Sequence, residues 1–299
     1  MIFSPKQGAP QESKTMAYLN VGKENSAEID LYYEDRGTGK PVLLIHCWPL
    51  NGSSWERQTA ALLASGHRVI TYDRRGFGRS SQPGIGYDYD TLAGDTNKLI
   101  QLLDLDGVTL VGNSMGGGEV ARYLGKYAEP GRVTQAVFMA SITPALRHAA
   151  NNPEGVDPAI FEGIKQSIEA DRFAFFEAMF KSFYNQEQLL GTRISPAAVQ
   201  AGFAAACSSS YQAVLNCVDA WLEDFREDIA RIKIPTLVLH GDSDQMVPFE
   251  VSGKRMADLL PDAQLHLVKG GPHGIFWTHA AEVNQVLLRF ISQDRSGLA

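Results

Sequence analysis

Two kinds of hydrophobic pattern alternate along this chain. Short, almost continuous apolar runs occur at 41–46, 68–73, 108–112, 133–140, 235–240 and 263–268. Such runs are typical of strands that are buried on both faces of a parallel sheet. The segments between them place apolar residues at helical spacing, as Leu92, Leu99 and Leu103 do. The alternation therefore predicts strand–helix–strand units, with helices on both faces of a mostly parallel sheet.

The remaining core elements can be placed in the same way. Segments 17–21 and 29–34 predict an antiparallel pair at the start, which brings the predicted sheet to eight strands. Helices are expected at 55–64, 89–105, 119–127, 249–260 and 278–291. Together these elements predict one α/β domain, because strands and helices alternate along the chain.

The alternation is interrupted once. From 142 to 231 the pattern is helical throughout, with apolar residues such as Phe161, Ile164 and Ile168 on one face. We therefore expect an α/β core formed by 16–141 and 232–299, with a helical cap at 142–231 that covers one edge of the sheet. Residues 1–15 contain Pro, Gln, Ser and Lys and predict a flexible N-terminal extension.

Composition narrows the class of protein. Of the 299 residues, 44% are hydrophobic and 20% are charged, which is typical of a soluble globular protein. The net charge of −7 gives no basic surface for nucleic acid. No apolar run approaches the roughly 20 residues of a membrane helix, and residues 1–15 lack the apolar stretch of a secretory signal. Three cysteines do not form a disulfide framework, so we expect a cytoplasmic protein.

A candidate nucleophile lies between a predicted strand and a predicted helix. The segment Gly112-Asn-Ser-Met-Gly116 fits G-x-S-x-G, in which a sharp strand-to-helix turn exposes a serine above the sheet. The flanking glycines allow the close backbone approach that this turn needs. The helix N-terminus beside Ser114 would favour a developing negative charge.

Two other interpretations of this segment are weaker. Ser114 could simply cap the helix in a glycine-rich turn, but the strand–turn–helix context favours a nucleophile. The run Gly116-Gly-Gly118 could also bind phosphate. It lacks, however, the Gly-Lys-Ser/Thr ending of a P-loop and the spacing of a dinucleotide-binding motif.

One of seven histidines has the right position for a general base. His273 lies in the glycine-rich loop Gly270-Gly-Pro-His-Gly274, directly after the last predicted strand. That loop can hold an imidazole over the carboxyl ends of the strands, where Ser114 emerges. The others end strands, lie inside a strand, begin the last helix, or belong to surface and cap segments: His46, His67, His148, His240, His266 and His279.

The acid is expected between serine and histidine, because this strand–turn–helix arrangement orders its triad Ser…Asp/Glu…His. The loop His240-Gly-Asp-Ser-Asp-Gln-Met-Val-Pro248 offers Asp242 and Asp244. We choose Asp244, which is deeper in the loop, whereas Asp242 suits a turn-forming role. Asp73 precedes Ser114, begins a tight turn and is interpreted as structural.

The site also needs donors for an oxyanion. In this arrangement one donor is the backbone N–H of the residue after the nucleophile, here Met115. The second comes from the loop after the third strand, which reads His46-Cys-Trp-Pro49, so we expect the N–H of Trp48. The Trp48 ring can at the same time be a buried aromatic under the cap.

With these positions placed, the chain from about Met16 onward resembles the cofactor-free bacterial haloperoxidases, α/β-hydrolases that overlap with perhydrolases and aryl esterases. The resemblance rests on segments 31–39 (LYYEDRGTG), 54–58 (SWERQ), 69–78 (VITYDRRGFG), 118–123 (GEVARY), 191–195 (GTRIS), 272–274 (PHG) and 277–279 (WTH). It implies the α/β-hydrolase fold and a triad of Ser114, Asp244 and His273. It also implies no metal or haem cofactor and a homo-oligomer, either a trimer or a dimer.

The expected chemistry is acyl transfer through Ser114. The partners would be a small apolar ester or short carboxylic acid, and then water or, as the resemblance implies, hydrogen peroxide. Peroxide would yield a peracid that oxidises halide in solution. The same triad could instead hydrolyse a C–C bond, a lactam or a lactone, and a non-catalytic ligand receptor could reuse the pocket.

Two residues depart from the family pattern. Cys47 stands where the family usually has glycine, and it would be strained by about 1–2 kcal/mol if that position required a positive φ. Asn113 precedes the nucleophile where aromatic residues or histidine are more familiar. Both lie beside the expected site and bear on substrate preference and activity.

Overall fold

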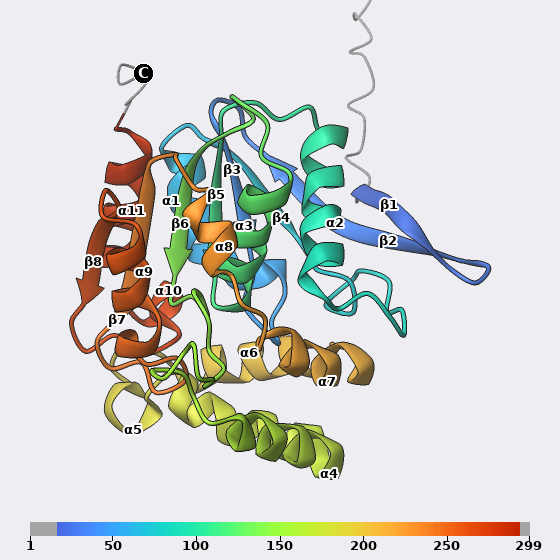
Figure 1. Ribbon diagram of the computed structural model, residues 1–299, viewed down its shortest axis with the longest axis vertical. Helices are drawn as coiled ribbons and strands as arrows, with labels where there is room; N and C mark the ends of the chain where they lie inside the picture. Colours follow the sequence, from blue (N-terminus) through green and yellow to red (C-terminus); the bar gives the residue numbers. More distant parts are fainter. Residues whose placement is uncertain (1–16, 294–299) are drawn as a thin grey trace, which may run out of the picture.

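The computed structural model describes residues 17–293, and within them eight strands form one sheet in the order β1-β2-β4-β3-β5-β6-β7-β8 (Figure 1). The strands are β1 (Ala17–Glu24), β2 (Ala27–Arg36), β3 (Pro41–Ile45), β4 (Arg68–Tyr72), β5 (Val108–Asn113), β6 (Val133–Met139), β7 (Thr236–Gly241) and β8 (Gln264–Val268). Within this described part of the chain, only the pairings of β2 with β1 and with β4 are antiparallel. The predicted eight-stranded, mostly parallel sheet is therefore confirmed. The predicted extension at 1–15 lies outside the described residues.

Helices that connect the strands or follow the last one cover the sheet. The core helices are α1 (Glu56–Ala64), α2 (Tyr89–Leu102), α3 (Met115–Lys126), α9 (Gly253–Leu259), α10 (Ile275–Thr278) and α11 (Ala280–Ile291). Helix α1 packs against α11, whereas α2 packs against α3. All six residues of β5 are buried, as a central strand covered on both faces requires. Each fully buried Val or Leu in such a strand contributes roughly 1.5–3 kcal/mol.

The segment between β6 and β7 carries five helices in the described chain: α4 (Pro158–Phe183), α5 (Gln186–Leu189), α6 (Pro196–Cys207), α7 (Tyr211–Ala220) and α8 (Arg226–Ala230). In Figure 1, α4, α6 and α7 lie beyond the carboxyl ends of the strands. The short helix α8 instead packs against α3 of the core. The division into a core and a cap at 142–231 stays a prediction.

The expectation that this segment is helical from its start is wrong. Residues 142–157 form an irregular loop with isolated bridges between Arg147 and Val156 and between Ala149 and Asn152. The loop contains Pro144 and Pro153, which cannot donate a helical hydrogen bond. Helix α4 begins only at Pro158, where the Asp157 side chain accepts a hydrogen bond from the N–H of Ala159 at 2.9 Å.

One predicted core helix is also divided. The one expected at 249–260 consists of a 3₁₀ turn, Phe249–Val251, and α9, separated by Ser252 with φ −131° and ψ −87°. The Ser252 hydroxyl donates to the carbonyl of Ser141 and so holds the break in place. The last predicted helix, 278–291, is α11, with the short α10 before it. Of the helices in residues 17–293, none combines the length and apolar character that crossing a bilayer requires.

Candidate active site

Ser114 stands in a sharp turn between β5 and α3. Its backbone has φ +54° and ψ −117°, a conformation that is rare for a residue with a side chain. Such strain costs of order 1–3 kcal/mol and is found mainly at functional sites. The turn is held because Ser114 N–H donates to the Met139 carbonyl and Gly117 N–H donates to the Ser114 carbonyl, both at 2.9 Å.

The glycines on either side of the turn are required by close packing. A Cβ on Gly112 would lie 2.3 Å from the carbonyl oxygen of Gly116. A Cβ on Gly116 would lie 2.5 Å from the carbonyl oxygen of Ile45 in β3. Both partners are backbone atoms that cannot rotate away. The prediction that these glycines permit a tight approach is confirmed.

The predicted acid and base meet beside this turn. Asp244 follows β7 and His273 follows β8, and these parallel strands are neighbours in the sheet. The Nδ1 atom of His273 lies 2.7 Å from Oδ2 of Asp244, and the side chains of both residues are almost fully buried. The other oxygen, Oδ1, accepts the N–H groups of Met246 and Val247 at 2.8 and 2.9 Å. Both oxygens of the carboxylate are thus held by hydrogen bonds.

The surroundings keep Asp244 ionised. Burial favours its neutral form, but the charge of His273 and hydrogen bonds from His240 and His273 outweigh burial and hold its pKa well below the usual value of 3.8. The Nε2 atom of His240 lies 3.4 Å from Oδ2 of Asp244 and 2.8 Å from the carbonyl of Val247. A buried anion is therefore available to orient the His273 ring and to stabilise its protonated form.

The competing carboxylates are used elsewhere. Asp242 is exposed, and its Oδ1 accepts the N–H of Gly270 at 2.7 Å, which ties two loops together. Asp73 accepts N–H groups of Gly52 and Arg79, each at 2.8 Å, and so closes the turn after β4. Both therefore have the structural roles expected of them.

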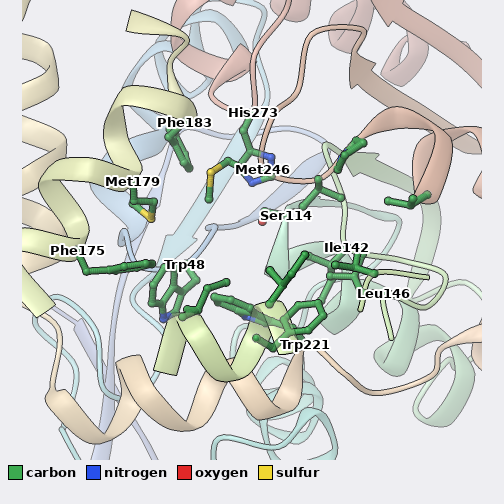
Figure 2. A pocket seen from close by; sticks show the side chains of 17 residues that line it. Trp48, Ser114, Ile142, Leu146, Phe175, Met179, Phe183, Trp221, Met246 and His273 are labelled. Carbon is green, nitrogen blue, oxygen red and sulfur yellow. The ribbon is translucent and has the colours of Figure 1, made fainter. Parts of the chain in front are cut away.

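Ser114 and His273 share the wall of an apolar cavity of about 110 Å³ (Figure 2). The other lining residues are hydrophobic, among them Phe175 and Phe183 of α4 and Trp221, which follows α7. In the described chain no hydrogen bond joins the Ser114 hydroxyl to His273. Such bonds are often loose without substrate and tighten when substrate binds.

The two expected oxyanion donors have no other use in the described chain. Met115 is the first residue of α3, so its N–H has no acceptor within the helix. The Trp48 ring lines the cavity, and it packs edge-on against the Trp221 ring with centroids 4.8 Å apart. Within residues 17–293, neither the N–H of Trp48 nor that of Met115 has a protein acceptor. The oxyanion role of these two N–H groups stays a prediction.

A family profile described as the α/β hydrolase fold matches residues 40–280. The chain belongs to the α/β hydrolases. It is 54% identical to a Synechocystis sp. protein that is provisionally named a non-heme chloroperoxidase, over 92% of this chain and 100% of that one. It is 38% identical to the non-heme chloroperoxidase CPO-A1 of Kitasatospora aureofaciens, over 89% and 97% of the two chains. Identity to the bifunctional esterase/perhydrolase of Acinetobacter calcoaceticus is 33%, over 88% and 96%.

A solved structure agrees with these relatives. The bromoperoxidase from Bacillus anthracis is 45% identical to this α/β hydrolase and superposes with a TM-score of 0.88, over 93% of this chain and 100% of that one. The resemblance to the haloperoxidase branch of the α/β hydrolases is therefore confirmed.

The departures Cys47 and Asn113 cause little backbone disturbance in this α/β hydrolase. Cys47 does not adopt a positive φ, so the strain considered for that position does not arise. Its thiol is buried, which raises its pKa to about 12 and keeps it protonated. The Asn113 side-chain amide donates to the Met139 carbonyl at 2.9 Å, while its buried Oδ1 has no partner in the described chain.

Sequence reasoning missed a buried ion pair that contacts the loop His46-Cys-Trp-Pro49. Arg74 Nε lies 2.9 Å from Glu119 Oε2, and both side chains are at most 1% exposed. Arg74 also donates to the His46 carbonyl at 2.9 Å, while its own backbone N–H donates to His46 Nε2 at 3.0 Å. Tyr72 donates its hydroxyl to Glu119. The only sequence signal was that Glu119 follows three glycines on a helix whose first turns must be buried.

Proposed function

We propose that this α/β hydrolase is an acyl-transfer enzyme with Ser114 as nucleophile, His273 as general base and Asp244 as the acid of the triad. One observation carries the proposal. A serine in a strained turn shares an apolar cavity with a histidine, and that histidine is hydrogen-bonded to a buried, ionised aspartate. Nucleophile, base and orienting group are the three parts that this chemistry requires.

In the first half of the reaction an ester is bound with its carbonyl carbon beside Ser114. His273 takes the hydroxyl proton while Ser114 Oγ attacks that carbon. The resulting oxyanion accepts the N–H groups of Trp48 and Met115, and losing one such donor costs roughly 3 kcal/mol in comparable sites. His273 then gives its proton to the leaving alcohol, and an acyl group remains on Ser114.

In the second half an oxygen nucleophile releases the acyl group. Water gives the carboxylic acid, which is esterase activity. Hydrogen peroxide gives the peracid, because one peroxide oxygen replaces the water oxygen at the acyl carbon. Peracid and halide then react in solution to give the carboxylate and hypohalous acid. The relatives named as chloroperoxidases and as an esterase/perhydrolase support this branch.

The cavity favours small, uncharged, apolar acyl groups. Its volume is about 110 Å³, and none of its described lining residues is a lysine or an arginine. A charged substrate would lose its hydration without gaining an ionic partner. We therefore propose small apolar esters, and short carboxylic acids in their neutral, protonated form, as substrates. A C–C bond, lactam or lactone hydrolase with the same triad stays an alternative, but dianionic substrates of that class would lack a cationic partner.

The test is a profile of hydrolysis and perhydrolysis across p-nitrophenyl esters of increasing acyl length, with Ser114→Ala as the blank. We expect a preference for short acyl groups and a loss of both activities in the variant. A lactone or vinylogous diketone that is turned over much faster than every ester would favour the alternative.

We also propose that the protein works in the cytoplasm as a homo-oligomer, a trimer or a dimer. The three cysteines are free, which suits a reducing compartment. The oligomer rests on the family resemblance, and analytical ultracentrifugation tests it. The segment 142–231 would serve as the cap, since ten of the cavity residues, Ile142 and Phe183 among them, belong to it.

A further inference from the structure

Two thioethers lie in the wall of the catalytic cavity. Met246 belongs to the loop that carries Asp244, and Met179 belongs to α4. In Figure 2 the Met246 side chain extends into the cavity from the His273 side, and the Met179 sulfur lies between Phe175 and Phe183. Among the described lining residues these are the only two sulfur atoms. A peracid released from Ser114 would leave through a space that they border.

We propose that Met179 and Met246 are an oxidation site that the enzyme's own peracid modifies during turnover. This inference rests on the proposed function, because it takes the peracid from the acyl-enzyme on Ser114. A thioether is readily converted to a sulfoxide, and the change is reversible by methionine sulfoxide reductases. In this step the oxidant is the percarboxylic acid released from Ser114, and the products are a methionine sulfoxide and the carboxylic acid.

The step balances without another reactant. A sulfur lone pair attacks the terminal peroxy oxygen, and the O–O bond breaks as the S–O bond forms. The proton of that oxygen passes to the departing carboxylate. Sulfur is oxidised by two electrons, and the peroxy group is reduced by the same two.

The modification would change the cavity where its apolar character matters. A sulfoxide places a polar oxygen among hydrophobic side chains, which weakens the binding of apolar acyl groups. Met246 also donates its backbone N–H to Asp244 at 2.8 Å. Displacing the oxidised Met246 side chain would therefore disturb the position of the Asp244 carboxylate. We expect activity to fall with the number of perhydrolysis cycles completed.

The chain contains its own reference residues. Met115, Met139 and Met256 are completely buried, and none of them lines the cavity. An oxidant that acts from within the cavity should reach Met179, which is only 6% exposed to solvent, before it reaches these three. Oxidation that follows general exposure would spare Met179 and favour the half-buried Met246.

The experiment incubates the purified full chain with acetate, hydrogen peroxide and an excess of free methionine, and maps oxidised peptides by mass spectrometry. Free methionine captures peracid in bulk solution, and its sulfoxide measures how much peracid was made. Ser114→Ala in the same mixture gives the background from peroxide alone. We expect one added oxygen on Met179 and on Met246 in the wild type, unmodified reference methionines, and only background oxidation in Ser114→Ala.

The outcomes separate the two proposals. Peracid in solution with unmodified Met179 and Met246 overturns this inference and leaves the proposed function intact. Equal oxidation in the wild type and Ser114→Ala also overturns it. Absence of peracid overturns the peroxide branch of the proposed function and this inference together. The double variant M179L/M246L provides a further test. For each perhydrolysis turnover, its esterase rate should fall by a smaller fraction of its starting value than the wild-type rate does. An equal fractional loss in the two proteins counts against the inference.

Discussion

The Nδ1 atom of His273 is held 2.7 Å from Oδ2 of Asp244, on a carboxylate that also faces His240. The carboxylate fixes the ring so that its other nitrogen can face Ser114. In comparable triads, replacing the aspartate by asparagine lowers kcat by about 10⁴. We expect a loss of that order for Asp244→Asn, measured as p-nitrophenyl acetate hydrolysis.

Asp242 supplies the matched control, because it lies in the same loop but is exposed. Among residues 17–293 its side chain accepts hydrogen bonds only from Ser243 Oγ and Gly270 N–H. Asp242→Asn should keep most of the activity. A larger loss of activity for Asp242→Asn than for Asp244→Asn would show that Asp244 is not the acid of the triad.

The depressed pKa of Asp244 also predicts how stability depends on pH. A carboxyl group whose pKa is lower in the folded state stabilises the protein above its unfolded pKa. That contribution is lost as the pH falls below the ordinary value of 3.8 toward the folded value. The free energy of unfolding in urea should therefore fall more steeply between pH 4 and lower pH in the wild type than in Asp244→Asn. Parallel curves would contradict this assignment.

Ser114 is expected to carry both hydrolysis and halogenation. Because one acyl-enzyme precedes both products, Ser114→Ala should lower esterase and halogenation turnover together, by on the order of 10⁴ or more. A fluorophosphonate should label the wild type and not the variant, which also separates an enzyme from a non-catalytic receptor. Halogenation that survives the substitution would rule out a shared intermediate.

The turn around Ser114 predicts a stability difference between two glycines. A Cβ on Gly116 would lie 2.5 Å from the Ile45 carbonyl oxygen, so Gly116→Ala should destabilise the fold by at least about 1–3 kcal/mol. Gly163 lies in α4 with nothing within 4 Å of an added Cβ, so Gly163→Ala should stabilise by about 0.5–1 kcal/mol. Thermal unfolding of both variants measures the difference. If Gly116→Ala is as stable as Gly163→Ala, the close approach is not required.

Much of this architecture follows from local pattern and chain order. Strand–helix alternation located the sheet, and the order of serine, acid and base selected Asp244 and His273 from several candidates. The structure brings these two side chains together because each residue follows a strand, and neighbouring parallel strands bring their carboxyl ends together. Glycine spacing identified the turn at Ser114, because the close backbone approach there requires glycine at both flanking positions.

Other features depend on contacts between distant segments, and no local sequence pattern predicts them. The two methionines of the cavity are separated by 180–245 in the chain and meet only because α4 lies over the loop after β7. The irregular loop at 142–157 interrupts a sequence whose apolar spacing otherwise suits helices. The sequence did not identify Glu119 as the partner of Arg74, because the two residues are 45 positions apart in the chain.

That buried pair leads to a prediction about the oxyanion loop. Removing one member of a buried ion pair typically costs 3–5 kcal/mol, because the other charge is left without a partner. Glu119→Gln should destabilise the protein by about that amount and should lower kcat as well, since Arg74 also holds the His46 carbonyl that precedes Trp48. Urea unfolding and esterase kinetics measure the two effects.

The exposed pair of Arg132 with Asp104 is the control, because a pair at the surface contributes little. Asp104→Asn should leave both unfolding and kcat nearly unchanged. If Arg74 acts only on stability, Glu119→Gln assayed well below its unfolding temperature will keep the wild-type kcat. A reduced kcat in fully folded enzyme, with KM little changed, will instead show that the pair positions the Trp48 N–H for the oxyanion, since that N–H acts mainly in the transition state.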